Sequence, residues 1–320
     1  MVAESLTESL TINIAFASML NARIAWEWWG NADNLDDCLA KSAVASARAL
    51  EQGNARVIVE VFVPELFDPL SGAMMSNEGD QQRYWGMTRA FCDGLVAATG
   101  LRLRAIYPDA GVAAMLSSQW SDAQFSLSSL NDRQPVQSDD ELVVVACPDP
   151  QGVAEVRKIA DALMREPSEE SGASVAGLGR PLVLFNPRLA SGDVGIGLSV
   201  RRLRSEFLAS FCMAYALRPF EGGAVFKQHP DKWKVFYADP AQQGRFTLIA
   251  ERAERPGGEE LENIILDFLD EGIAGSQNGA RGGQDGGSVG DSEPPGWAST
   301  LGEVGKVAAS LQRFMRDITR

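Results

Sequence analysis

The stretch LVLFNPRL, residues 182–189, decides how this chain is expected to fold. Its first four residues are apolar and predict a buried strand, which ends at Asn186-Pro187-Arg188. Near-continuous apolar strands of this kind are typical of a parallel sheet that is covered on both faces. Three other apolar runs end in the same way, at a proline with a polar or charged neighbour: VIVEVFVPEL (57–66), LRLRAIYPDA (101–110) and LVVVACPDP (142–150).

The segments that separate these strands have the periodicity of helices. Helices are expected over 35–53, 80–100, 109–120 and 149–166, and a short strand over 123–130. This alternation predicts an α/β fold with a mostly parallel, Rossmann-like sheet and helices on both faces.

The pattern changes in the C-terminal half of the chain. A long helix is expected over 198–217, LSVRRLRSEFLASFCMAYAL. Three short strands joined by turns are expected over 222–253, and a closing helix over 258–272. The sheet is therefore predicted to carry a C-terminal antiparallel extension.

Composition divides the chain into four parts. Residues 1–34 are an N-terminal extension of unclear status, and residues 35–273 are predicted to form a single α/β domain. Residues 274–297 are rich in glycine and predict a flexible linker. Residues 298–320 predict an amphipathic helix, which either folds back on the domain, docks on a partner or lies on a membrane surface.

The charge and hydropathy of the chain exclude several classes of function. The net charge of −14 argues against nucleic-acid binding, which requires a basic face. No run reaches the ~18 uncharged apolar residues of a membrane-spanning helix, so membrane contact is expected to be at most peripheral, through residues 298–320. The first residues lack the basic segment of a signal peptide, and Glu4 and Glu8 are unlike a transit peptide.

Cysteine and histidine usage limits the chemistry further. The four cysteines, Cys38, Cys92, Cys147 and Cys212, contain no C-x-x-C pair, and a reducing compartment is the simplest interpretation. His229 is the only histidine, so a site with several histidines is impossible, and its neighbours Pro230 and Asp231 predict a turn. We expect no catalytic residue, no metal and no cofactor.

The proline-ended strands allow two interpretations. Carboxyl ends of parallel strands meet at one edge of a sheet, where ligands bind in open α/β folds. Such an edge would bring together Glu65, Asp109, Asp149, Asn186 and Arg188. The favoured interpretation is structural, because proline ends a strand and aspartate before a helix is a good N-cap. Asp109 and Asp149 both precede helical patterns, and Pro150 suits the first helical position.

The loop before residue 198 gives a second possible ligand site. Gly195 and Gly197 lie between a strand and a helix, and Arg201 and Arg202 follow in the first helical turn. Such a loop can bind a phosphate, although the G-x-x-G-x-G order is not the dinucleotide fingerprint. The alternative function is therefore a phospho-ligand or nucleotide-binding enzyme or sensor that uses the strand ends and this loop.

Several stretches, taken in order, resemble an uncharacterised domain family of cyanobacteria and plastid-bearing eukaryotes. The family includes the chloroplast low-photosystem-II-accumulation assembly protein of plants and the C-terminal domain of a chloroplast adenylate-kinase-like protein. The stretches that carry the resemblance are LDDCLAKSAVASARALEQGNARVIVEV (35–61), IYPDAGVAAMLSSQW (106–120), LVVVACPDP (142–150), LVLFNPRL (182–189), RRLRSEFLASFCMAYALRPF (201–220) and DKWKVFYAD (231–239).

The resemblance implies a setting and a role. It implies a chloroplast protein, in the stroma or at the periphery of the thylakoid. For one branch of the family it further implies a role in photosystem II assembly. Together with the lack of a catalytic constellation and the amphipathic C-terminal segment, it favours a non-enzymatic protein that binds proteins of the assembly machinery. It supplies no catalytic residues, and the chain has no phosphate-binding loop that could carry adenylate kinase activity. Residues 1–34 and those after about 273 are not covered by the resemblance.

Overall fold

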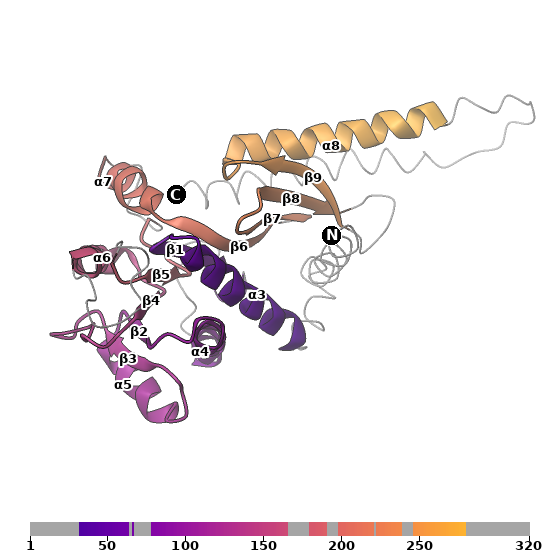
Figure 1. Cartoon of the computed structure of the whole chain (residues 1–320). Helices are drawn as coiled ribbons and strands as arrows, with labels where there is room; N and C mark the ends of the chain where they lie inside the picture. The colour runs from indigo at the N-terminus through magenta and orange to yellow at the C-terminus, as the bar shows by residue number, and fades with distance from the viewer. Residues whose placement is uncertain are drawn as a thin grey trace, which may run out of the picture.

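The chain forms one mixed sheet with helices on both faces (Figure 1). The described residues give this sheet nine strands, in the order β3-β2-β4-β5-β1-β6-β7-β8-β9. The computed structural model describes residues 32–63, 66, 78–165, 179–190, 198–220, 222–238 and 246–279.

The first part of the sheet is parallel. Helices separate its strands along the chain as the sequence predicts, except that β4 follows β3 with no helix between them. The elements are α3 (Ala32–Glu51), β1 (Arg56–Val61), α4 (Glu78–Thr99), β2 (Leu103–Tyr107), α5 (Ala110–Gln119), β3 (Ser126–Ser129), β4 (Leu142–Ala146), α6 (Val153–Arg165) and β5 (Leu182–Phe185). Strands β3, β2, β4, β5 and β1 are parallel to their neighbours in that order.

The second part of the sheet is antiparallel and is joined to the first through β6. Strand β6 is parallel to β1 and antiparallel to β7, which continues the sheet through β8 and β9. Helix α8 follows β9 and packs on this part of the sheet. The elements are α7 (Leu198–Arg202), β6 (Cys212–Phe220), β7 (Gly223–Gln228), β8 (Trp233–Ala238), β9 (Phe246–Arg252) and α8 (Gly258–Gly279).

The expected helix over 198–217 is wrong in its second half. Helix α7 ends at Arg202 and passes into a π-helix, Leu203–Phe207, and a short 3-10 turn, Leu208–Ser210. Residues 212–217 instead form the first part of β6, with 214–217 buried. A consecutive apolar run such as CMAYAL suits a buried strand as well as a helix, so periodicity does not separate the two.

Helices cover the two faces of the sheet in different ways. Helices α3, α4 and α5 pack on one face, called here the first face, against alternate residues such as Val57, Val59 and Phe185. On the second face, α6 and the π-helix cover the parallel strands, while α8 covers the antiparallel strands. The predicted α/β fold, with its mostly parallel sheet and antiparallel extension, is therefore confirmed.

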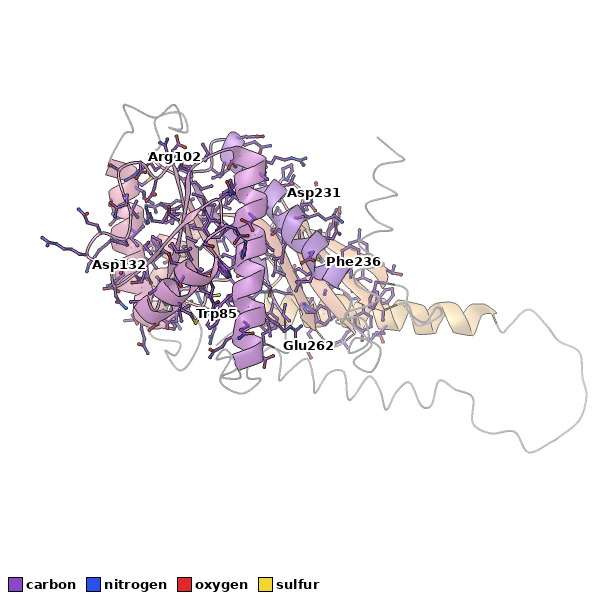
Figure 2. All side chains as sticks on the ribbon, turned by 90° about the horizontal axis from the view of Figure 1, so that it is seen from below. Trp85, Arg102, Asp132, Asp231, Phe236 and Glu262 are labelled. Atoms are coloured by element: carbon purple, nitrogen blue, oxygen red, sulfur yellow. The ribbon has the colours of Figure 1, made fainter. Side chains whose placement is uncertain are left out.

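Helices α3 and α4 lie against each other on the first face, as the view from that side shows (Figure 2). A side chain at Gly94 of α4 would place its Cβ 3.1 Å from the Cβ of Ala43 on α3. The glycine therefore lets the two helices approach closely, and alanine-rich α3 presents small side chains at the same contact.

The ends of the predicted domain are only partly described. Helix α8 runs to Gly279 and so continues six residues past 273, where the linker was expected to start. The N-terminal segment before residue 32, the rest of the linker and the amphipathic segment 298–320 lie outside the described residues.

The centre of the first face gives a test of this packing. Phe185 is fully buried, and its ring stacks on that of Phe91 with centroids 4.7 Å apart. We expect Phe185→Ala to lower the free energy of unfolding by about 3–5 kcal/mol in urea denaturation, because it leaves a cavity. Val44→Ala, at a side chain that is 52% exposed, is the control and should change it by less than about 0.5 kcal/mol. Equal effects would contradict this packing.

Candidate functional site

The structure brings the proline-ended strands to one edge of the sheet. Strands β2, β4, β5 and β1 are neighbours and parallel, so Pro108, Pro148 and Pro187 follow strand ends on the same side. Asp109, Asp149, Asn186 and Arg188 therefore share this edge. Glu65, the fifth polar residue expected there, lies outside the described residues.

The two aspartates at this edge cap helices. Oδ1 of Asp109 accepts a hydrogen bond from the backbone N–H of Val112 at 2.8 Å, at the start of α5. Oδ1 of Asp149 accepts from the N–H groups of Gln151 and Gly152, at 2.9 and 3.0 Å. Both predictions of an N-cap are thus confirmed, and Pro150 begins the short 3-10 turn that leads into α6.

Asn186 joins β5 to β1 beyond the end of the strand ladder. Its backbone N–H donates to the carbonyl oxygen of Val59 at 2.7 Å. Its side-chain Oδ1 accepts from the N–H of Val61 at 2.6 Å, and Nδ2 donates to the carbonyl of Val61 at 3.1 Å. Asn186 is buried and has a φ of 47°, a left-handed conformation that asparagine tolerates better than most residues.

This carboxamide occupies the point where a ligand would be expected in such a sheet. Helix α4 follows β1 on the first face, whereas α6 and the π-helix next to β5 cover the second face. Adjacent strands β1 and β5 therefore send their connections to opposite faces, which makes a topological switch point. Here the polar groups of Asn186 are satisfied by the backbone of β1.

Arg188 lies near Tyr84 and Asp149, which both affect its pKa. Burial lowers the pKa of Arg188, while Tyr84 and Asp149 raise it. The phenol of Tyr84, on α4, is buried, and this burial raises its pKa, while a hydrogen bond with Asn186 and the charge of Arg188 lower it. Sequence reasoning missed Tyr84, because only the packing of α4 on the sheet brings residue 84 near residues 186 and 188.

The second predicted ligand site is only partly described. Gly195 and Gly197 lie outside the described residues. Arg201 and Arg202 are exposed at the end of α7, a helix of five residues. Phosphate binding by this loop, like ligand binding by Asp109, Asp149, Asn186 and Arg188, therefore stays a prediction.

The histidine lies in a turn, as predicted, but its ring has two partners. Residue 229 follows β7, and Nε2 of His229 is 2.7 Å from Oε1 of Gln52. Nδ1 is 3.5 Å from the sulfur of Cys212, at the start of β6. Burial raises the pKa of Cys212, although Lys227 lowers it, so the thiol is protonated near neutral pH. The pair is therefore not a preformed thiolate nucleophile.

The described ranges contain neither a metal-binding cluster nor a membrane-spanning helix. No group of three or more histidine, cysteine, aspartate or glutamate side chains there is arranged to hold a metal ion. Within the same ranges, no helix is both long and apolar enough to cross a membrane.

Comparison with known proteins identifies the family. The family described as Domain of unknown function (DUF1995) matches residues 33–263, which is most of the chain and all of the described sheet. The chain therefore belongs to this family. A search of curated proteins gave no match.

The hydrogen bonds of Asn186 can be tested by substitution. We expect Asn186→Ala to lower the free energy of unfolding by about 2–4 kcal/mol, because it leaves the polar groups of Val61 unpaired and strains a left-handed residue. Glycine adopts the left-handed conformation without strain, so Asn186→Gly should be about 1 kcal/mol more stable than Asn186→Ala. The rest of the loss remains, because glycine also leaves the polar groups of Val61 unpaired. Urea denaturation measures both.

The matched control is Asn131→Ala, at an exposed asparagine whose Nδ2 donates to the carbonyl of Pro108. We expect a loss of less than about 1 kcal/mol there, since solvent replaces the bond. If Asn186→Ala and Asn131→Ala lower the free energy of unfolding by the same amount, Asn186 does not hold β1 and β5 together.

Proposed function

We propose that this member of the DUF1995 family is a non-enzymatic plastid auxiliary protein that supports photosystem II assembly by binding other proteins. The setting, in the stroma or at the periphery of the thylakoid, comes from the resemblance of its stretches to the chloroplast assembly protein. The net charge of −14 fits a partner other than nucleic acid.

One observation favours this proposal over the alternative of a phospho-ligand or nucleotide-binding enzyme or sensor. Asp109, Asp149 and Asn186 would hold the ligand in that alternative, and each of them already bonds the chain's own backbone. The carboxamide of Asn186 could bind a ligand only by breaking its bonds to Val61, which would leave buried backbone groups unpaired at a cost of about 1–3 kcal/mol each. Asp109 and Asp149 each already use one carboxylate oxygen in a helix cap.

The part of the chain expected to reach a partner is the amphipathic segment 298–320. Val304, Leu311 and Ile318 fall on one face of this segment in a helical projection. Because the residues before this segment are rich in glycine, we expect them to act as a flexible tether through which the segment binds a partner protein or touches a membrane surface.

The proposal predicts a specific defect in the photosynthetic organism that carries the gene. Disruption of the gene should lower the amount of photosystem II relative to photosystem I, measured on native gels and by chlorophyll fluorescence. The full chain should restore the ratio, whereas a chain that ends at residue 297 should restore it only in part, because it lacks the binding segment. An unchanged ratio after disruption would refute the proposal.

A rescue experiment separates the proposed function from the alternative. The double variant Asp109→Ala/Asp149→Ala loses two helix caps, which costs roughly 2 kcal/mol of stability. If the protein acts by binding partners, this variant should rescue photosystem II once it accumulates to the normal level. A variant that accumulates normally and yet fails to rescue would instead indicate a ligand site at the strand ends.

A further inference from the structure

Three charged side chains from distant parts of the sequence lie together on the second face of the sheet. Glu60 projects from β1 on this face, since its neighbours Val59 and Val61 pack on the first face. Glu60 is paired with Ala216 of β6, which packs with α8, whereas Ile58, two residues earlier on β1, packs with α6 and the π-helix. Glu60, Arg218 and Arg255 are called the Glu60 cluster below, and the charge of the exposed Arg204 acts on Arg255.

Two arginines contact the one carboxylate. Nε of Arg218, on β6, donates to Oε2 of Glu60 at 2.6 Å. A terminal guanidinium nitrogen of Arg255, in the connection between β9 and α8, lies 3.5 Å from the same oxygen. Because both arginines share one carboxylate oxygen, neither forms the two-bond pair that a guanidinium makes with a carboxylate.

Aromatic rings fix both guanidinium groups. Arg218 lies over the ring of Phe62 at 5.9 Å from the centroid, and Arg255 lies over Trp233 at 5.7 Å. The side chains of Arg218 and Arg255 are nevertheless 25% and 31% exposed, so a molecule from solvent can reach them. The cluster is therefore held in place and open on one side.

Positive charge is in excess within the cluster. Burial would raise the pKa of Glu60, but Arg218 and Arg255 together lower it, so the carboxylate is ionised. Burial lowers the pKa of Arg255, Glu60 raises it, and the charges of Arg218 and Arg204 lower it further. Two guanidinium groups therefore contact one carboxylate, and the charge of a third arginine, Arg204, acts on Arg255, in a chain whose net charge is −14.

We propose that the Glu60 cluster binds the phosphate group of a small molecule, with Arg218 and Arg255 as binding residues and Arg204 as an additional positive charge. A phosphate is negatively charged, and Arg218 and Arg255 carry one positive charge more than Glu60 balances, to which Arg204 adds its own charge. Its oxygens also fit the planar fork of arginine, which binds phosphate through two parallel bonds.

The cluster is distinct from the strand-end residues and from the glycine loop. The negative charge of Glu60 repels phosphate, and its carboxylate competes with phosphate for the guanidinium of Arg218. The affinity for phosphate is therefore modest, and anions that carry less charge bind more weakly still. The binding site does not depend on the proposed role in photosystem assembly. Phosphate binding at this site would make the activity of the protein, in photosystem assembly or elsewhere, respond to a metabolite that carries a phosphate group.

Isothermal titration of the full chain at fixed ionic strength tests the proposal. The probes are inorganic phosphate and glycerol 3-phosphate, which separate free phosphate from a phosphate monoester, and acetate serves as the carboxylate comparison. We expect binding of at least one phosphate probe and weaker binding of acetate. Arg255→Gln should weaken phosphate binding by about tenfold or more, since it removes a charged donor.

Two variants make the test specific. Arg252→Gln removes the same charge three residues away, at a partly exposed side chain paired with Glu260, and should leave the affinity within about twofold. Glu60→Gln removes the competing carboxylate and should tighten phosphate binding by about fivefold or more. A cluster that only stabilises the fold would show no tightening.

Each outcome of these titrations either supports the proposal or overturns it. Folding of each variant is checked by circular dichroism, and affinity is compared only among folded proteins. The proposal is overturned if the natural chain binds neither phosphate probe at millimolar concentration. It is overturned too if Arg255→Gln and Arg252→Gln weaken binding equally, or if Glu60→Gln does not tighten it.

Discussion

The carboxamide of Asn186 bonds both backbone groups of Val61, and the rest of the sheet depends on this contact. It fixes the end of β1 against β5, at the position where the connections of the two strands leave toward opposite faces. Strand β1 also pairs with β6, which starts the antiparallel half. A single side chain thus secures the strand on which both halves of the sheet meet.

The parts of the fold that could be predicted are those encoded by local patterns. Strands β1, β2, β4 and β5 were visible as apolar runs, and the prolines after them marked their ends. The helix caps at Asp109 and Asp149 were predictable because a cap depends only on residues two or three positions away. Strand β6 was missed because residues 212–217 form an uninterrupted apolar run, of which 214–217 are buried, so neither the helical nor the strand period stands out.

The polar contacts between distant strands could not be predicted. Asn186 and Val61 are 125 residues apart, and Glu60 and Arg218 are 158 residues apart. Strand order decides both pairs, and one sequence does not reveal strand order. The strand-end residues were therefore predicted as a group. The side chains of three of them, Asp109, Asp149 and Asn186, bond the backbone.

Side-chain NMR of the arginine Nε–Hε groups during a phosphate titration tests the central claim most directly. The claim is that the strand-end residues hold the fold while anion binding belongs to the Glu60 cluster on the second face. The predicted result is a saturable shift of the Arg218 and Arg255 signals, with the signal of Arg188 unchanged. A shift of Arg188, with Arg218 and Arg255 unaffected, would contradict the claim and make the strand ends the site.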